Sequence, residues 1–210
     1  MSEPTAAAAR PAPGPRRWPA VAALAALLAG LAGCFYYDAD IRVAPDGSVR
    51  VRETLRLDPE WKASIGDTLQ AAERVLGRYV EEARGRGGRI VANAGDSAVA
   101  EFRYPSLRAF DRAWPDSSDH GQQWDRSVWR RGEVDGQATD ELILWRMSPP
   151  KPSDKPGKQR QPVLTFWVTP PAPPLRHNAH ATRGGTYVWR FTEQMTAPDS
   201  VWIAWPAGGK

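Results

Sequence analysis

Two stretches of alternating apolar and polar residues, separated by a four-residue turn, constrain the fold of this chain most. Residues 37–43 alternate, residues 49–57 do the same, and 45–48 between them read Pro-Asp-Gly-Ser. Period-two alternation is typical of a half-buried strand, and this turn offers a glycine for positive φ. The pattern predicts an antiparallel hairpin. Glu53 falls in phase with the apolar set; it is either a buried carboxylate or, as we favour, a bulge or edge position.

One long amphipathic helix is predicted after the hairpin. Apolar residues recur there at helical spacing, behind Asp67 as a candidate cap, and the glycine-rich segment 85–88 ends the pattern. A second, short helix is expected after Pro105, with Ser106 as its cap. The stripe that we expect to cover the sheet consists of Leu69, Ala72, Leu76, Tyr79, Val80 and Ala83.

The rest of the chain reads mostly as strands, which predicts an α+β fold: an antiparallel sheet that starts with a β-hairpin and is covered by one main amphipathic helix. Two proline-rich segments, 148–162 and 169–185, are expected to form extended loops. The strands are expected around 89–94, 99–104, 123–130, 141–147, 163–168, 186–192 and 201–205. We assign residues 34–210 to one domain of this kind.

The N-terminus is typical of an export leader. Arg16 and Arg17 precede residues 20–32, a run of 13 residues without charge that ends in Leu31-Ala32-Gly33-Cys34. This run fits a signal-peptide core and is shorter than the ~20 residues that span a bilayer. The ending resembles the lipobox of bacterial lipoproteins, in which the cysteine receives the lipid. The alternative is a short anchor helix that happens to end in a cysteine.

The lipobox resemblance implies that residues 1–33 are a cleaved signal peptide with an Ala/Pro-rich start, and that Cys34 becomes the lipidated N-terminus of the mature chain. Two or more acyl chains give stable membrane anchoring where one does not. Phe35 follows the cysteine, where an aspartate would resemble an inner-membrane retention signal. We therefore expect an exported lipoprotein, in the outer membrane of a Gram-negative cell and otherwise on the outer face of the plasma membrane.

Charge and cysteine content exclude several classes of protein. The net charge is +4, from 28 basic and 24 acidic residues, and these charges are scattered rather than clustered as nucleic-acid binding requires. The single cysteine leaves no internal disulfide framework and no cysteine-rich zinc site. The predicted partner is the membrane, through Cys34, together with an envelope lipid or a protein.

Residue patterns that carry catalysis or cofactor binding are hard to find. The sequence has no nucleophile elbow, phosphate-binding loop, dinucleotide fingerprint or zincin motif. His177 and His180 lie three apart in a loop, and a metal there would need His120 or Asp119 as a third ligand. We predict no metal, no cofactor and no catalytic residue. Four carboxylates could in principle supply a glycosidase pair but are expected to be surface charges that flank a turn: Glu133, Asp135, Asp140 and Glu141.

Aromatic residues are unusually frequent, with 10 Trp, 5 Tyr and 5 Phe. Tyr187, Trp189 and Phe191 share one face of a late strand, and Trp202 and Trp205 fall on opposite faces of another. These residues form either a core of large side chains, which we favour, or an aromatic cavity or platform for acyl chains or sugars. The ligand-binding residues are not predicted.

The order of the lipobox cysteine, a strand over 38–43, the Pro-Asp-Gly-Ser turn, a second strand and a late Thr-Tyr-Val-Trp-Arg-Phe strand resembles the LppM-like bacterial lipoprotein domain. The resemblance covers Cys34 to Trp205 as a pattern. It implies a helix-grip type of α+β fold and binding of envelope glycolipids, and no ligand contacts transfer with it. The leading hypothesis is a non-enzymatic lipoprotein that binds a lipid or another envelope component. The alternatives are an assembly lipoprotein that docks a protein partner and, least favoured, an envelope hydrolase.

Overall fold

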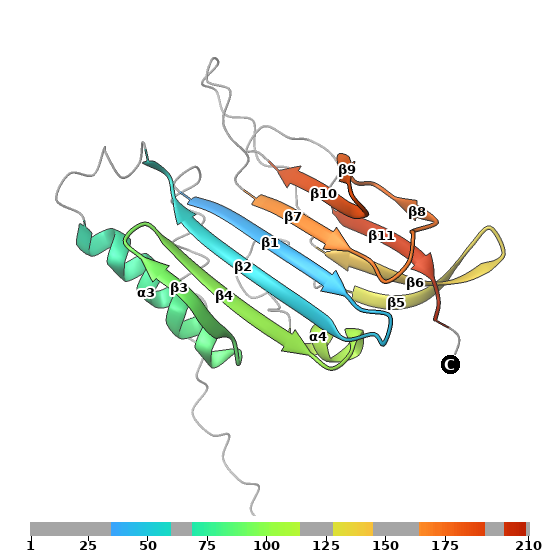
Figure 1. The fold of residues 1–210 in the computed structure, drawn as a ribbon, viewed down its shortest axis with the longest axis horizontal. Helices are drawn as coiled ribbons and strands as arrows, with labels where there is room; N and C mark the ends of the chain where they lie inside the picture. The colour runs from blue at the N-terminus through green and yellow to red at the C-terminus, as the bar shows by residue number, and fades with distance from the viewer. Residues whose placement is uncertain (1–34, 60–68, 114–127, 145–163, 192–199, 209–210) are drawn as a thin grey trace, which may run out of the picture.

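A computed structural model describes residues 35–59, 69–113, 128–144, 164–191 and 200–208 (Figure 1). Within these ranges the chain forms two helices and eleven strands. The helices are α3 (Leu69–Gly85) and α4 (Leu107–Ala113). Helices and sheets are thus both present, as an α+β fold requires, but strands dominate.

The larger sheet has seven strands in the order β3-β4-β2-β1-β7-β10-β9. Its centre is the predicted hairpin of β1 (Phe35–Val43) and β2 (Val49–Leu57). In the turn, Gly47 has a φ of +82°, and the N–H of Ser48 donates to Oδ1 of Asp46 over 2.9 Å. The positive φ predicted for the turn glycine is therefore confirmed. The other strands are β3 (Arg89–Ala94), β4 (Ser97–Tyr104), β7 (Leu164–Thr169), β9 (Ala181–Arg183) and β10 (Thr186–Phe191).

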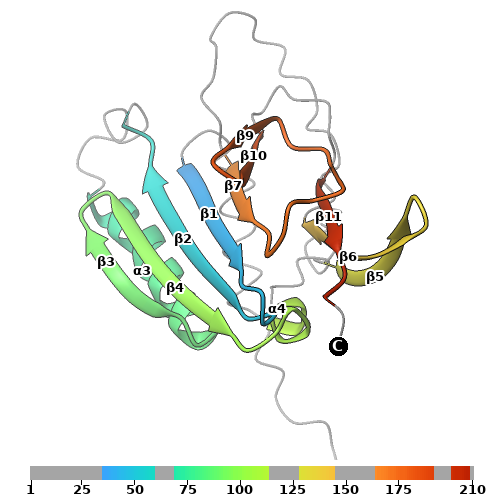
Figure 2. The same ribbon diagram turned by 45° about the vertical axis from the view of Figure 1, so that its right-hand side comes forward.

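A second sheet of four strands corrects the prediction of a single antiparallel sheet. Its order is β5-β6-β11-β8, and Figure 2 shows β5, β6 and β11 as a layer of their own. The larger sheet is also mixed, because β1 pairs with β7 in parallel. Alternation within one strand identifies a strand but carries no information on its partner or direction, so neither feature was predictable from local patterns. The strands are β5 (Val128–Val134), β6 (Gln137–Leu144), β8 (Arg176–His177) and β11 (Val201–Pro206).

The proline-rich segment 169–185 was expected to be a loop, and this prediction is wrong in part. Strands β8 and β9 both lie within it. They are short and follow the last of its prolines, so their N–H groups are free to pair with β11 and β10. The other predicted loop, 148–162, lies outside the described residues.

Both predicted helices are present. Helix α3 packs against β2, β3 and β4. Leu76, Tyr79, Val80 and Ala83 of the predicted stripe are buried, and so is Val75, which the prediction left out. Helix α4 begins after Ser106, whose Oγ accepts the N–H of Ala109 over 3.1 Å, so the predicted cap is confirmed. The predicted cap of α3, Asp67, lies outside the described residues.

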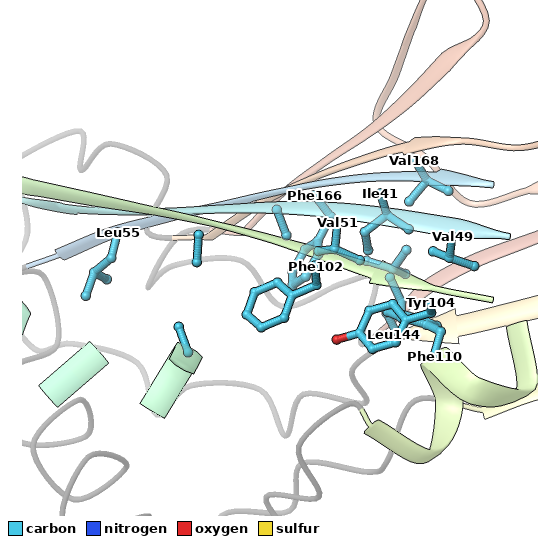
Figure 3. Packing of buried hydrophobic residues seen from close by; sticks show 14 of the residues in the cluster. Ile41, Val49, Val51, Leu55, Phe102, Tyr104, Phe110, Leu144, Phe166 and Val168 are labelled. Carbon is cyan, nitrogen blue, oxygen red and sulfur yellow. The ribbon is translucent and has the colours of Figure 1, made fainter. Parts of the chain in front are cut away.

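The core lies on one face of the seven-stranded sheet, which we call the inner face. Helices α3 and α4 and the four-stranded sheet all contribute to one continuous cluster there. In Figure 3 the labelled side chains of the larger sheet point toward the side where Phe110 and Leu144 lie. The buried apolar residues of the described chain run from Ala39 to Trp205.

Candidate functional site

The most unusual buried group is Glu53 on β2, which the sequence favoured as a bulge or edge residue. The strand is regular there, with Glu53 opposite Ala39 and Ala100, and the residue is 1% exposed. The Arg86 guanidinium donates to both of its oxygens, from Nη1 over 3.1 Å and from Nη2 over 2.8 Å. The Tyr79 hydroxyl donates to Oε2 over 3.3 Å. The favoured interpretation is therefore wrong, and the buried carboxylate is the observed one.

The end of α3 places Arg86 against Glu53. Gly87 takes a φ of +82°, and the N–H of Gly88 donates to the carbonyl of Ala83 over 2.7 Å, the bond that closes a Schellman motif. Gly88 also lets the Phe102 ring approach, since a Cβ at Gly88 would lie 2.5 Å from a ring carbon. The Arg86 guanidinium stacks 4.6 Å from the centroid of that ring, a cation–π contact. The glycine-rich helix end predicted from the sequence thus holds the Arg86 guanidinium against the Glu53 carboxylate.

Electrostatics keep the tyrosines and the arginine of this Glu53 cluster, formed by Tyr37, Glu53, Tyr79 and Arg86, protonated at neutral pH. Burial, reinforced by the Glu53 charge, raises the pKa of Tyr79 and of Tyr37 well above 10. Burial opposes the Arg86 charge, but the hydrogen bonds and charge of Glu53 outweigh it and raise the pKa of Arg86. Burial likewise raises the pKa of nearby Tyr104 to about 12. At neutral pH the tyrosines are therefore donors rather than bases, and the cluster ties the end of α3 to β2.

The opposite side of the seven-stranded sheet, the outer face, is rich in arginine. The register of β1, β2, β3, β4, β9 and β10 places eight arginines and three carboxylates on it. All three carboxylates are paired, Asp40 with Arg42, Asp38 with Arg56, and Glu101 with both Arg52 and Arg89. The remaining arginines are Arg50, Arg103, Arg183 and Arg190, which form no ion pair with a described carboxylate.

Three of these arginines lie side by side at one end of the outer face. Arg42 is opposite Arg50 across β1 and β2, and Arg50 is opposite Arg103 across β2 and β4. Residues directly opposite in an antiparallel pair have Cβ atoms about 5 Å apart, and like charges there are destabilising. We call Arg42, Arg50 and Arg103 the arginine row.

The histidines are engaged by the backbone. Nδ1 of His180 accepts the N–H of Arg190 over 2.9 Å, and Nδ1 of His177 accepts the N–H of Ala179 over 3.2 Å. Burial lowers the pKa of His180, consistent with a neutral ring. Among the described residues no group of three or more ligating side chains is placed to hold a metal ion. His120 and Asp119 lie outside those residues.

The four carboxylates that could supply acid–base chemistry divide into two kinds. Glu133 and Asp135 are exposed near the β5–β6 turn, as expected. Asp140 and Glu141 are buried, at 9% and 5% exposed, so their assignment as surface charges is wrong. They are consecutive on β6 and point to opposite faces of its sheet, which separates their carboxyl groups. Glu141 instead accepts a 2.8 Å hydrogen bond from Arg130 on the neighbouring strand.

The described tryptophans divide between the core and half-buried positions, so the favoured interpretation as a core is confirmed only in part. Trp189 and Trp205 are 0% and 1% exposed, while Trp129, Trp167 and Trp202 are half-buried. Asn178 links two strands to the core, because its Oδ1 accepts the Trp189 Nε1–H over 2.7 Å and the Trp202 N–H over 2.8 Å. The exposed large hydrophobic side chains of the described chain are Val91 and Leu175.

The proposed lipid-attachment residue, Cys34, lies outside the described residues, and strand β1 begins at the next residue, Phe35. No helix in the described ranges has the length and apolar character needed to cross a membrane.

The fold and these features define a two-sheet α+β domain with a buried Glu–Arg cluster and a basic sheet face. No protein-family model and no curated protein matches the chain. Among solved structures, the chain is similar to the folded domain of the LppM protein of Mycobacterium tuberculosis, determined by NMR. The two share 13% identity, with 84% of this chain and 92% of that chain covered and a TM-score of 0.44. At this level the similarity carries no information on ligand or function.

Proposed function

We propose that this chain is an exported lipoprotein of the bacterial envelope, anchored through lipidated Cys34, whose domain binds a lipid or another envelope component without catalysing a reaction. The observation that carries the proposal is the position of the only cysteine. It ends a signal-like leader and directly precedes β1. Acylation at Cys34 would therefore anchor the chain directly before the first strand of the larger sheet.

Mass spectrometry of the full chain purified from bacterial membranes tests the anchor. We expect a chain that begins at Cys34 and carries a diacylglycerol and an N-acyl chain, whereas Cys34→Ser keeps the leader and gains no lipid. An unmodified Cys34 within a full-length chain would instead support the alternative of a short anchor helix.

Binding of a lipid inside the domain needs a separate test. The chain that begins at Phe35 contains the described core, and native mass spectrometry of it after purification from an envelope fraction would reveal a stoichiometric lipid. An apo mass that persists after incubation with envelope lipid extract would contradict an interior lipid site.

Docking of a protein partner is a second candidate, supported by edge strand β3. All of its residues except Ile90 are exposed, and Val91 is 40% exposed. Exposed edges pair with strands of other chains, although the bulge between Ile90 and Ala92 disfavours this. A photo-crosslinker at Val91 in intact cells should capture a specific envelope protein if β3 docks one, and the same crosslinker at Glu81 on α3 is the control.

A further inference from the structure

We propose that the outer face of the seven-stranded sheet lies on an anionic membrane surface, with the arginine row, Arg42, Arg50 and Arg103, binding lipid phosphates. The inference draws on the proposed anchor at Cys34 for the choice of partner.

Charge is the first step. The outer face carries eight arginines against three carboxylates, and all three carboxylates are already paired. Arg50 and Arg103 are exposed and form no ion pair with a described carboxylate. Every cation on this face is arginine, whose planar fork matches phosphate oxygens in pairs. The excess of arginine over carboxylate on the outer face is therefore suited to binding phosphate groups.

Stability is the second step. The row places like charges directly opposite one another across three strands, an arrangement that costs stability. Local rules of this kind are broken mainly where function requires it. An anionic surface neutralises the repulsion between these arginines. Relief of this repulsion therefore adds to the free energy of binding.

Geometry is the third step. The described helices and the four-stranded sheet contribute to the core on the inner face, and the arginines of the outer face are exposed. Strand β1 starts at Phe35, beside the proposed anchor, and reaches Arg42 after seven residues, about 23 Å at strand spacing. A domain lying with its outer face down keeps the start of β1 and the arginine row on the same membrane plane.

Vesicle binding by the chain that begins at Phe35 tests the inference without the anchor. Binding is measured by co-sedimentation with phosphatidylglycerol-containing vesicles and with pure phosphatidylcholine vesicles, at low and high salt. Each arginine near an anionic surface is worth about a five-fold change in partitioning, so the triple variant Arg42→Gln, Arg50→Gln, Arg103→Gln should bind about 100-fold more weakly. Screening by salt should weaken the wild type in the same direction.

A charge-matched control removes three arginines of α3, Arg74, Arg78 and Arg84, on the other side of the sheet. It should retain binding. Because Cys34 is the only cysteine, this shortened chain also accepts single-cysteine fluorophores. A label at Thr54→Cys on the outer face should be quenched by nitroxide lipids, and a label at Glu81→Cys on α3 should not.

Three results would overturn the inference: no preference for anionic vesicles at low salt, equal loss of binding in both triple variants, or equal quenching of both labels. Circular dichroism of each variant shows that it is folded before binding is measured. A failure here leaves the acylation of Cys34 untouched, because that modification is measured separately on the full chain.

Discussion

Breaking the Glu53–Arg86 pair should cost much of the free energy of unfolding of the domain. Arg86→Ala leaves a carboxylate that is 1% exposed with only tyrosine hydroxyls as partners, and removing one member of a buried pair costs about 3–5 kcal/mol. Glu53→Ala should cost less, about 2–3 kcal/mol by the same reasoning, because the Arg86 side chain is 17% exposed and lies 3.9 Å from Glu82.

Urea unfolding followed by circular dichroism measures these changes. The double variant Glu53→Leu, Arg86→Met should recover most of the loss, since apolar replacement of a buried pair is often neutral or stabilising. Part of the loss will remain because Tyr79 keeps a hydroxyl without its acceptor. Arg84→Met, on the exposed side of the same helix turn, is the control and should change little. If each single variant cost less than about 1 kcal/mol, the pair would be solvated and the reasoning would be refuted.

Three further changes test other parts of the structure. Gly88→Ala should destabilise by about 1–3 kcal/mol, seen in urea unfolding, because its Cβ would meet the Phe102 ring at 2.5 Å. Gly132→Ala should also lower the unfolding midpoint, because the new Cβ would crowd the Glu141 carboxylate, which must move. The pKa of His180 is lowered in the folded state. The contribution of its neutral ring to the free energy of unfolding is therefore complete above pH 6.5, the ordinary pKa of histidine, and is lost as the pH falls below that value. His180→Gln should flatten that part of the stability–pH profile, and an unchanged slope would contradict the assignment.

The elements that the sequence predicts well are those specified by nearby residues. The β1–β2 hairpin follows from alternation on both sides of Gly47, and α3 follows from a stripe that ends in glycines. The parallel pairing of β1 with β7, with Tyr37 opposite Leu164, joins segments far apart in the chain. No local pattern contains that pairing, and the division into two sheets depends on it.

The sequence indicates the burial of Glu53 but not the identity of its partner in the Glu53 cluster. The apolar phase of Glu53 signalled burial, but its partner lies 33 residues further along, beyond the end of α3. An arginine inside a glycine-rich helix end is the signal that would have linked them. The arginine row is even harder to predict from the sequence, because Arg103 joins Arg42 and Arg50 only through the register of β4 on β2.

The two charged features of the sheet differ in how their charge is compensated, and this difference separates their roles. On the inner face, each oxygen of Glu53 accepts a guanidinium N–H, so the charge is satisfied within the domain and contributes to its stability. On the outer face, Arg50 and Arg103 lie directly opposite each other across the strands and form no ion pair with a described carboxylate. Replacing Arg50 by glutamine should therefore stabilise the free domain slightly at low salt while weakening its binding to anionic vesicles. A destabilised Arg50→Gln domain would mean that the row serves the fold rather than a partner.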